Sequence, residues 1–395
     1  MRVSAAALLC LAVVTAACGT NEKSSTPHTK GEAIAEVIPT AGPVLYGEYV
    51  AWGEGGLGVG GSETEIRLMA RSLSGTARVV WEHHPSRGRP EWWFNGLEGS
   101  PQRLAFARAW SNCEPAPYDQ CGVEEEIAVA APGEDVQSLP RHDTDCGFSP
   151  GGHHVDVDRG KVALSGPYCV PQCAPPYCRP QCGPCWRIAI DDIGDRKPPR
   201  TLVHKSDGRD EVRIAGNFIA ARSGRTATVY DVRSGEVVYR AGLPSDFSRI
   251  DLQADGKMVA VWLLPGGSRA AWYSPEEPRK HVLPLRPVLY HEHEEHHQRV
   301  LVRMAEDRVA FESELSPGRS ALVVAGLDGR VVEEVARFDK SQLRVRDFDF
   351  DGKRLTWASQ EVLDAKTHCQ VEPHRGRICT TNYFGPTRIY AARLR

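Results

Sequence analysis

A short apolar triplet with a small residue at its centre recurs seven times along this chain of 395 residues. The copies are Val50-Ala51-Trp52, Leu104-Ala105-Phe106, Val162-Ala163-Leu164, Ile219-Ala220-Ala221, Val259-Ala260-Val261, Val309-Ala310-Phe311 and Leu355-Thr356-Trp357. Neighbouring copies are about 40 to 58 residues apart, a spacing at which internal repeats indicate propellers or solenoids. The chain is therefore expected to consist of seven similar units.

Each unit shows the pattern of several short strands. A tight-turn signal such as Asp255-Gly256 or Asp351-Gly352 precedes most triplets, and an apolar strand precedes the turn. A second hairpin of alternating strands follows, as at 228–232 and 236–239. Four strands per unit, repeated radially, form the blade of a propeller. We predict an all-β fold, a seven-bladed β-propeller of four-stranded antiparallel blades.

The two ends of the repeat region predict how the ring closes. The last unit has a third strand near 388–391 and no fourth strand after it. An orphan strand, 33–38, precedes the first unit. Pairing this N-terminal strand onto the final blade would close the ring and cover an unpaired edge. The alternative is two packed sheets with accidental repetition.

The repeat also resembles a known one. An Asp-Gly-Lys turn, an apolar-Ala-aromatic strand, the segment Thr228-Val229-Tyr230-Asp231-Val232 and the turn Ser234-Gly235 are similar to the TolB-type, WD40-like propeller repeat of secreted bacterial proteins. The resemblance covers residues 33–395. It implies binding or scaffolding more than catalysis, although a fold alone does not settle function.

The N-terminus resembles an export signal with a lipoprotein-type cleavage site. Residues 1–18 combine Arg2, a short apolar run and Ala16-Ala17-Cys18, which implies that Cys18 becomes the lipid-bearing N-terminus. Thr15 stands where Leu is usual, so ordinary signal cleavage remains open. Residues 19–32 are polar and predict a flexible tether. We expect a protein at the bacterial cell envelope, anchored to a membrane and either periplasmic or on the cell surface, with the propeller at 33–395.

Cysteine usage agrees with export. Of the 12 cysteines, Cys10 is in the signal and Cys18 is the lipidation site, so ten remain, and an even number in an exported protein favours disulfides. We predict the pairs Cys113–Cys121 and Cys369–Cys379, because each brackets one loop between second and third strands. The other six leave 15 connectivities open. They are Cys146, Cys169, Cys173, Cys178, Cys182 and Cys185.

Two other interpretations of the central cysteines, a zinc site and a redox-active pair, are alternatives to disulfides. Cys182 and Cys185 have the spacing of zinc ligands. However, the segment from Cys169 to Cys185 holds five cysteines, an odd number, and lacks the paired knuckles of a zinc ribbon. A redox-active pair normally opens a helix, whereas this pair runs into the strand 186–190.

The long loops are expected on one face of the ring. Loops after the second strand of a blade, and the connections between blades, leave the same face because successive strands alternate in direction. The longest loops belong to units seven, one, two and three, which are consecutive in a closed ring. This loop face would bind a protein or glycan partner. Its candidate contact residues are Trp110, Tyr118, Tyr168, Tyr177, Trp186 and Tyr383. The alternative is that these rings only order the loops.

A histidine-rich segment suggests a metal site. His291, His293, His296 and His297 alternate with glutamates, and imidazole with carboxylate suits a divalent transition metal. Acidic turns such as 349–351 could hold calcium. Ligands crowded into one loop seldom form a preorganised site, so no cofactor is expected.

Composition and motifs narrow the function further. The net charge of −3, from 48 basic and 51 acidic residues, lacks the excess of basic residues that is typical of nucleic-acid-binding proteins. No nucleophile elbow, zinc-protease helix or P-loop is present. We therefore expect a non-enzymatic binding or scaffold module. Two alternatives stay open. One is the metal-binding surface protein described above, and the other is a propeller enzyme of the lactonase or lyase type, for which Asp251, Arg303 and Asp347 are the charged candidates in a central channel.

Overall fold

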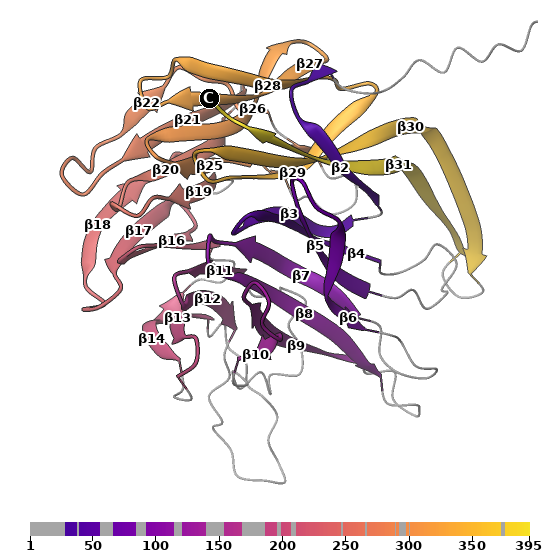
Figure 1. Ribbon diagram of the computed structural model, residues 1–395. Coiled ribbons are helices and arrows are strands. Elements are labelled where there is room, and N and C mark those ends of the chain that lie inside the picture. Colours follow the sequence, from indigo (N-terminus) through magenta and orange to yellow (C-terminus); the bar gives the residue numbers. More distant parts are fainter. Residues whose placement is uncertain are drawn as a thin grey trace, which may run out of the picture.

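The computed structural model is a ring of seven β-sheets (Figure 1). It describes residues 28–37, 39–55, 66–83, 92–113, 121–139, 154–167, 186–195, 199–206, 211–245, 248–264, 267–288, 290–291, 298–299, 301–372 and 376–395. Within these ranges the regular elements are strands, and no helix suitable for crossing a membrane occurs. The predicted seven-bladed, all-β propeller is confirmed.

Each blade is a consecutive antiparallel meander running outward from the ring's centre. Blade 1 contains β3 (Pro39–Tyr46), β4 (Tyr49–Glu54), β5 (Ile66–Ser72) and β6 (Ala77–His83). Blade 2 contains β7 (Trp92–Gly99), β8 (Leu104–Cys113), β9 (Cys121–Ala130) and β10 (Gln137–Ser138). Blade 3 contains β11 (His154–Asp158), β12 (Lys161–Pro167), β13 (Trp186–Asp192) and β14 (Arg200–Ser206). Blade 4 contains β15 (Glu211–Ala215), β16 (Phe218–Ser223), β17 (Thr226–Asp231) and β18 (Val237–Gly242).

The remaining blades follow the same plan. Blade 5 contains β19 (Ser248–Leu252), β20 (Met258–Leu264), β21 (Gly267–Tyr273) and β22 (His281–Leu283). Blade 6 contains β25 (Arg303–Ala305), β26 (Arg308–Ser316), β27 (Arg319–Gly326) and β28 (Val331–Asp339). Blade 7 contains β29 (Leu343–Phe350), β30 (Arg354–Glu372) and β31 (Gly376–Arg393). A small separate pair, β23 (Tyr290–His291) and β24 (Gln298–Arg299), lies between blades 5 and 6 in the sequence.

The N-terminal segment closes the ring, as predicted, and also extends to a second blade. β2 (Glu32–Val37) pairs antiparallel with β31 and supplies the fourth strand of blade 7. β1 (His28–Thr29), from the segment expected as a tether, pairs with β28 at the outer edge of blade 6. Ile34 of β2 is buried in a cluster with residues of blade 1, including Trp52. The N-terminal segment, residues 28–37, thus joins three consecutive blades.

All seven triplets lie in second strands, where alternation places their residues on two faces. In blade 3, Val162 and Leu164 pack with residues of blade 2, whereas Ala163 packs with residues of blade 4. The small central residue lets the following blade approach closely. Blade 5 is shifted by one position, because Ala260 there faces blade 4 and Val259 faces blade 6.

The hairpin of blade 7 extends beyond the other strands (Figure 1). Its backbone register places Cys369 opposite Cys379. In blade 2 the register likewise places Cys113 opposite Cys121. Each predicted disulfide pair therefore occupies directly paired positions of neighbouring strands.

Candidate functional site

The first strand of every blade contributes one residue to the centre of the ring. Six of these seven residues are charged, and each lies between apolar neighbours in its strand. They are Leu45 of β3, Glu98 of β7, Asp156 of β11, Arg213 of β15, Asp251 of β19, Arg303 of β25 and Asp349 of β29.

These residues occupy the same level of the ring because they lie opposite the triplets. Glu98 pairs with Ala105 and Asp156 with Ala163, the central triplet residues of their blades. The central residues of the triplets in blades 4, 6 and 7 are paired in the same way. In blades 1 and 5 the partner is the residue just before the centre.

Together the first strands and the turns that follow them line a cavity of about 520 Å³. The turn residues at its rim include Gly47, Arg159, Asp255, Glu306 and Asp351. Successive strands alternate in direction, so these turns lie on the face opposite to the one where second strands end. The cavity is therefore on the opposite face from the predicted loop face.

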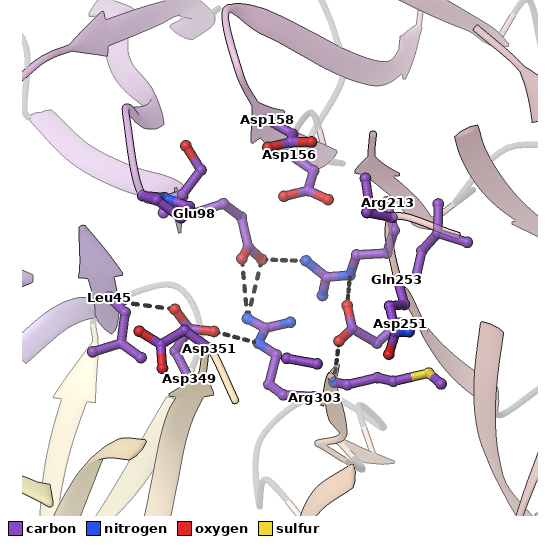
Figure 2. A pocket seen from close by; sticks show the side chains of 18 of the residues that line it. Leu45, Glu98, Asp156, Asp158, Arg213, Asp251, Gln253, Arg303, Asp349 and Asp351 are labelled. Atoms are coloured by element: carbon purple, nitrogen blue, oxygen red, sulfur yellow. Dashed lines mark hydrogen bonds and ion pairs between the residues drawn. The ribbon is translucent and has the colours of Figure 1, made fainter. Parts of the chain in front are cut away.

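One carboxylate spans the centre of the ring (Figure 2). Glu98 from blade 2 accepts hydrogen bonds from Arg213 of blade 4 at 2.6 Å and Arg303 of blade 6 at 3.0 Å. Arg303 also lies 3.2 Å from Asp349, and Arg213 lies 3.7 Å from Asp251. Through Glu98 the network links blades 2, 4 and 6, which are not neighbours in the ring.

Other carboxylates hold neighbouring blades together. The Oδ2 atom of Asp156 accepts from the backbone N–H of Ile214 at 2.7 Å, and that of Asp349 accepts from Leu45 N–H at 2.7 Å. Asp251 accepts in the same way from the N–H of Met304. Each bond joins one blade to the next, so these carboxylates have a structural role as well as a charge.

Burial and neighbouring charges set different protonation states around the ring. Burial raises the pKa of Asp156 to about 8 and that of Asp251 to about 6. Burial also opposes ionisation of Glu98, but Arg213 and Arg303 outweigh it and hold the pKa of Glu98 below its usual value. At neutral pH Glu98 is therefore charged, whereas Asp156 mostly retains a proton.

Two of the three charged residues predicted for the central channel lie in this site. Asp251 and Arg303 do line the cavity, but in blade 7 the lining residue is Asp349 rather than Asp347. Asp347 pairs with Ala358, further from the turn than Asp349, which is paired with Thr356. The residues not predicted for this channel were Glu98, Asp156, Arg213 and Asp349. The sequence signal that could have found them is their position: each is the first-strand residue that pairs, across the hairpin, with the central residue of the triplet.

Most of the other predicted site residues lie outside the described residues. These are Cys18, Tyr118, Cys146, Tyr168, Cys169, Cys173, Tyr177, Cys178, Cys182, Cys185, His293, His296 and His297. Strand positions are described for Trp110, Trp186, Tyr383 and His291, as for the four paired cysteines. Within the described part of the chain, no group of three or more metal-ligating side chains comes together.

The described lining has a limited chemical repertoire. It consists of eight carboxylates, four arginines, one serine, two glutamines and apolar residues, with no histidine, cysteine, lysine or threonine. The hydroxyl of Ser100 donates to the carbonyl of Arg103 and accepts from its N–H. Both of these hydrogen bonds join the Ser100 hydroxyl to the backbone of Arg103 and not to a side-chain base.

Comparisons with known proteins identify the fold. The chain is similar to the propeller domain of a prolyl endopeptidase, at 12% identity and a TM-score of 0.50, over 90% of this chain and 50% of that one. It is also similar to that of the Pyrococcus horikoshii acylaminoacyl peptidase, at 10% identity and a TM-score of 0.51, over 87% of this chain and 57% of that one. The chain thus spans about half the length of these structures. No protein-family model matches its sequence, and neither does any curated protein sequence.

Proposed function

We propose that this chain is a non-enzymatic binding propeller that holds a ligand in its central cavity. The observation that carries the proposal is the cavity of about 520 Å³, within the usual size of small-ligand sites, walled by the first strands of all seven blades. Fixed charged groups in a rigid concave wall favour recognition of one polar ligand.

The arrangement of the charged groups favours binding over chemistry. Asp156, Asp251 and Asp349 each accept a backbone N–H from the next blade, and Glu98 is held by two arginines. General acid–base catalysis needs a group that can reach the substrate and exchange a proton with it. Carboxylates that also hold the blades together are fixed in position, which suits a stationary binding group, and the described lining offers no histidine, lysine or cysteine to act with them on a substrate. The proposal requires no cofactor.

The opposite face is proposed to contact a protein or glycan partner. The backbone register places Cys113 opposite Cys121 and Cys369 opposite Cys379, and directly opposed positions of neighbouring antiparallel strands have a Cα separation compatible with a disulfide. Disulfides Cys113–Cys121 and Cys369–Cys379 would stiffen this face. Peptide mapping of the unreduced protein should recover both linked pairs. Recovery of either pair as free thiols would remove this support.

Export and anchoring through Cys18 remain part of the proposal. Lipidated Cys18 would place the chain in the membrane fraction of the cell envelope, and Cys18→Ser would release it. Equal membrane retention of the wild type and the variant would contradict the anchor. The fold does not depend on the outcome, because the described propeller begins ten residues later at His28.

A cavity-filling variant tests the binding function. Ala215 lines the cavity, so Ala215→Trp should occupy part of it. A panel of cationic, neutral and anionic small molecules, peptides and oligosaccharides would be screened for a rise in melting temperature. We expect at least one compound to stabilise the wild type and not the variant, and to be recovered chemically unchanged. Conversion of that compound, or the absence of any variant-sensitive compound, would refute the proposal.

A further inference from the structure

The charges around the central ring follow a pattern that is broken at one point. In two places an arginine is followed in the next blade by an aspartate: Arg213 by Asp251, and Arg303 by Asp349. In blades 2 and 3 the corresponding residues are Glu98 and Asp156, so two acids occur in succession. The arginine that would complete a third pair is replaced by a glutamate.

Asp156 and Asp349 can be compared directly because their backbone surroundings are the same. Each carboxylate accepts the N–H of the following residue at 2.9 Å through Oδ1, and an N–H of the next blade at 2.7 Å through Oδ2. Asp349 has in addition the guanidinium of Arg303 at 3.2 Å. Among the residues that the structure describes, no Lys, Arg or His forms an ion pair with Asp156.

Because Asp156 lacks the arginine that Asp349 has, its position in the cavity matters for ligand binding. Its side chain is directed into the cavity (Figure 2), and the residue is only 8% exposed. An ionised carboxylate can accept about four hydrogen bonds, and Asp156 uses two of these for backbone N–H groups. The remaining acceptor positions are available to a donor inside the cavity.

The rest of the cavity wall also favours a cation. Its eight carboxylates exceed its four arginines, each of which already lies beside a carboxylate. Of the carboxylates at the rim, Asp255 and Glu306 also pair with Lys257 and Lys353, so the unbalanced acid is the buried Asp156. Burying unbalanced charges of one sign is costly, so a ligand of the opposite charge is favoured. An anionic ligand would have to displace existing ion pairs.

We propose that the cavity binds a ligand through a guanidinium or primary ammonium group placed against Asp156, as Arg303 is placed against Asp349. This inference rests on the proposed binding function and names its ligand class. The group can come from a free amine or from a basic side chain of a polypeptide. Its recognition would be a charge-assisted hydrogen bond in a largely buried site.

Proton linkage provides a supporting signature. The pKa of Asp156 is raised to about 8, mainly by burial. Among the charges that face it, Arg213 lowers this pKa, whereas Glu98 and Asp251 raise it. The N–H of Ile214 also lowers it. A cation that requires ionised Asp156 should displace its proton at pH 7, so binding should release protons and strengthen as the pH rises.

Titration calorimetry of the exported chain tests this with three probes. They are a blocked Gly-Gly-Arg-Gly-Gly peptide, the same peptide with neutral citrulline for arginine, and agmatine. We expect the arginine peptide or agmatine to bind, and the citrulline peptide to bind at least tenfold more weakly. Equal affinity of agmatine and the arginine peptide identifies a small amine as sufficient, whereas tighter peptide binding identifies a polypeptide side chain.

Variants and buffers complete the test. Asp156→Asn should lower the affinity at least tenfold, whereas the control Asp192→Asn, at an exposed residue of the same blade, should stay within twofold. Titrations at pH 7 in two buffers of different ionisation enthalpy report proton release by the wild type, which decides the question if Asp156→Asn does not fold. Citrulline binding equal to arginine binding, or no released proton, would overturn the inference. A neutral or anionic cavity ligand would overturn it too and leave the binding function intact.

Discussion

Replacing Glu98 by glutamine should destabilise the whole ring, because one carboxylate serves two arginines from different blades. Breaking a buried ion pair by removing one partner typically costs about 3–5 kcal/mol. Arg303 keeps Asp349 at 3.2 Å and Arg213 keeps Asp251 at 3.7 Å, so part of that cost is offset. We therefore expect the free energy of unfolding to fall by about 3 kcal/mol, the low end of that range.

Glu134 provides a matched control in the same part of the chain. It pairs with Arg103 at 2.9 Å, close to the Glu98–Arg213 distance, but its side chain is 53% exposed. Exposed pairs of this kind contribute about 0.2–1 kcal/mol, so Glu134→Gln should have a small effect. Urea denaturation followed by tryptophan fluorescence compares the two variants at pH 7.

The pH dependence offers a second check on the same reasoning. The pKa of Glu98 is lowered in the folded state, so its contribution is present above its unfolded value and lost as the pH falls through the folded one. The difference between the wild type and Glu98→Gln should therefore shrink below about pH 4.5. Equal effects of Glu98→Gln and Glu134→Gln at pH 7 would refute the view that the central network stabilises the ring.

Three further predictions concern closure, packing and proton binding. Ile34→Ala should lower the free energy of unfolding by about 3 kcal/mol, since Ile34 is 6% exposed, whereas Val282→Ala, at 57% exposure, should change it by less than about 0.5 kcal/mol in the same urea assay. Tyr239→Phe should cost about 1 kcal/mol, because it removes the 2.8 Å hydrogen bond to the carbonyl of Gly256, and thermal melts would detect it. The pKa of Asp156 is raised to about 8 in the folded state, so stability should fall as the pH rises from about 4 to about 8. Denaturation midpoints at pH 5 and pH 8 should therefore differ less in Asp156→Asn than in the wild type. An unchanged difference would contradict the raised pKa of Asp156.

The fold was predictable because its signal is local and repeated. Each triplet is an apolar strand with a small residue where a neighbouring blade approaches closely, and this requirement recurs once per blade. The closing strand was predictable from an unpaired edge. The shift in blade 5 was not, because Val259-Ala260-Val261 has the same pattern in either register and the contacts with blades 4 and 6 decide between them.

The site was harder to predict because its members are close only in the folded ring. Glu98 and Arg303 are 205 positions apart and meet across the axis. Their individual strands show nothing beyond one charged residue among apolar ones, which is also the pattern of a solvated strand. Counting back from the turn would have selected Asp349 over Asp347, since the turn fixes which residue reaches the cavity. The ion pairs themselves depend on side-chain reach across the axis, which spacing does not encode.

The strand that seals the ring has a consequence for how the molecule assembles. β2 cannot pair with β31 until the last blade has been made and the intervening blades are in place. Contacts between residues so distant in sequence form slowly, because a very long loop must first be closed. Before that pairing forms, the ring is therefore an open crescent whose final edge is bare, and such edges pair readily with other chains. The interval before closure is thus when this protein is most vulnerable to aggregation and most dependent on chaperones.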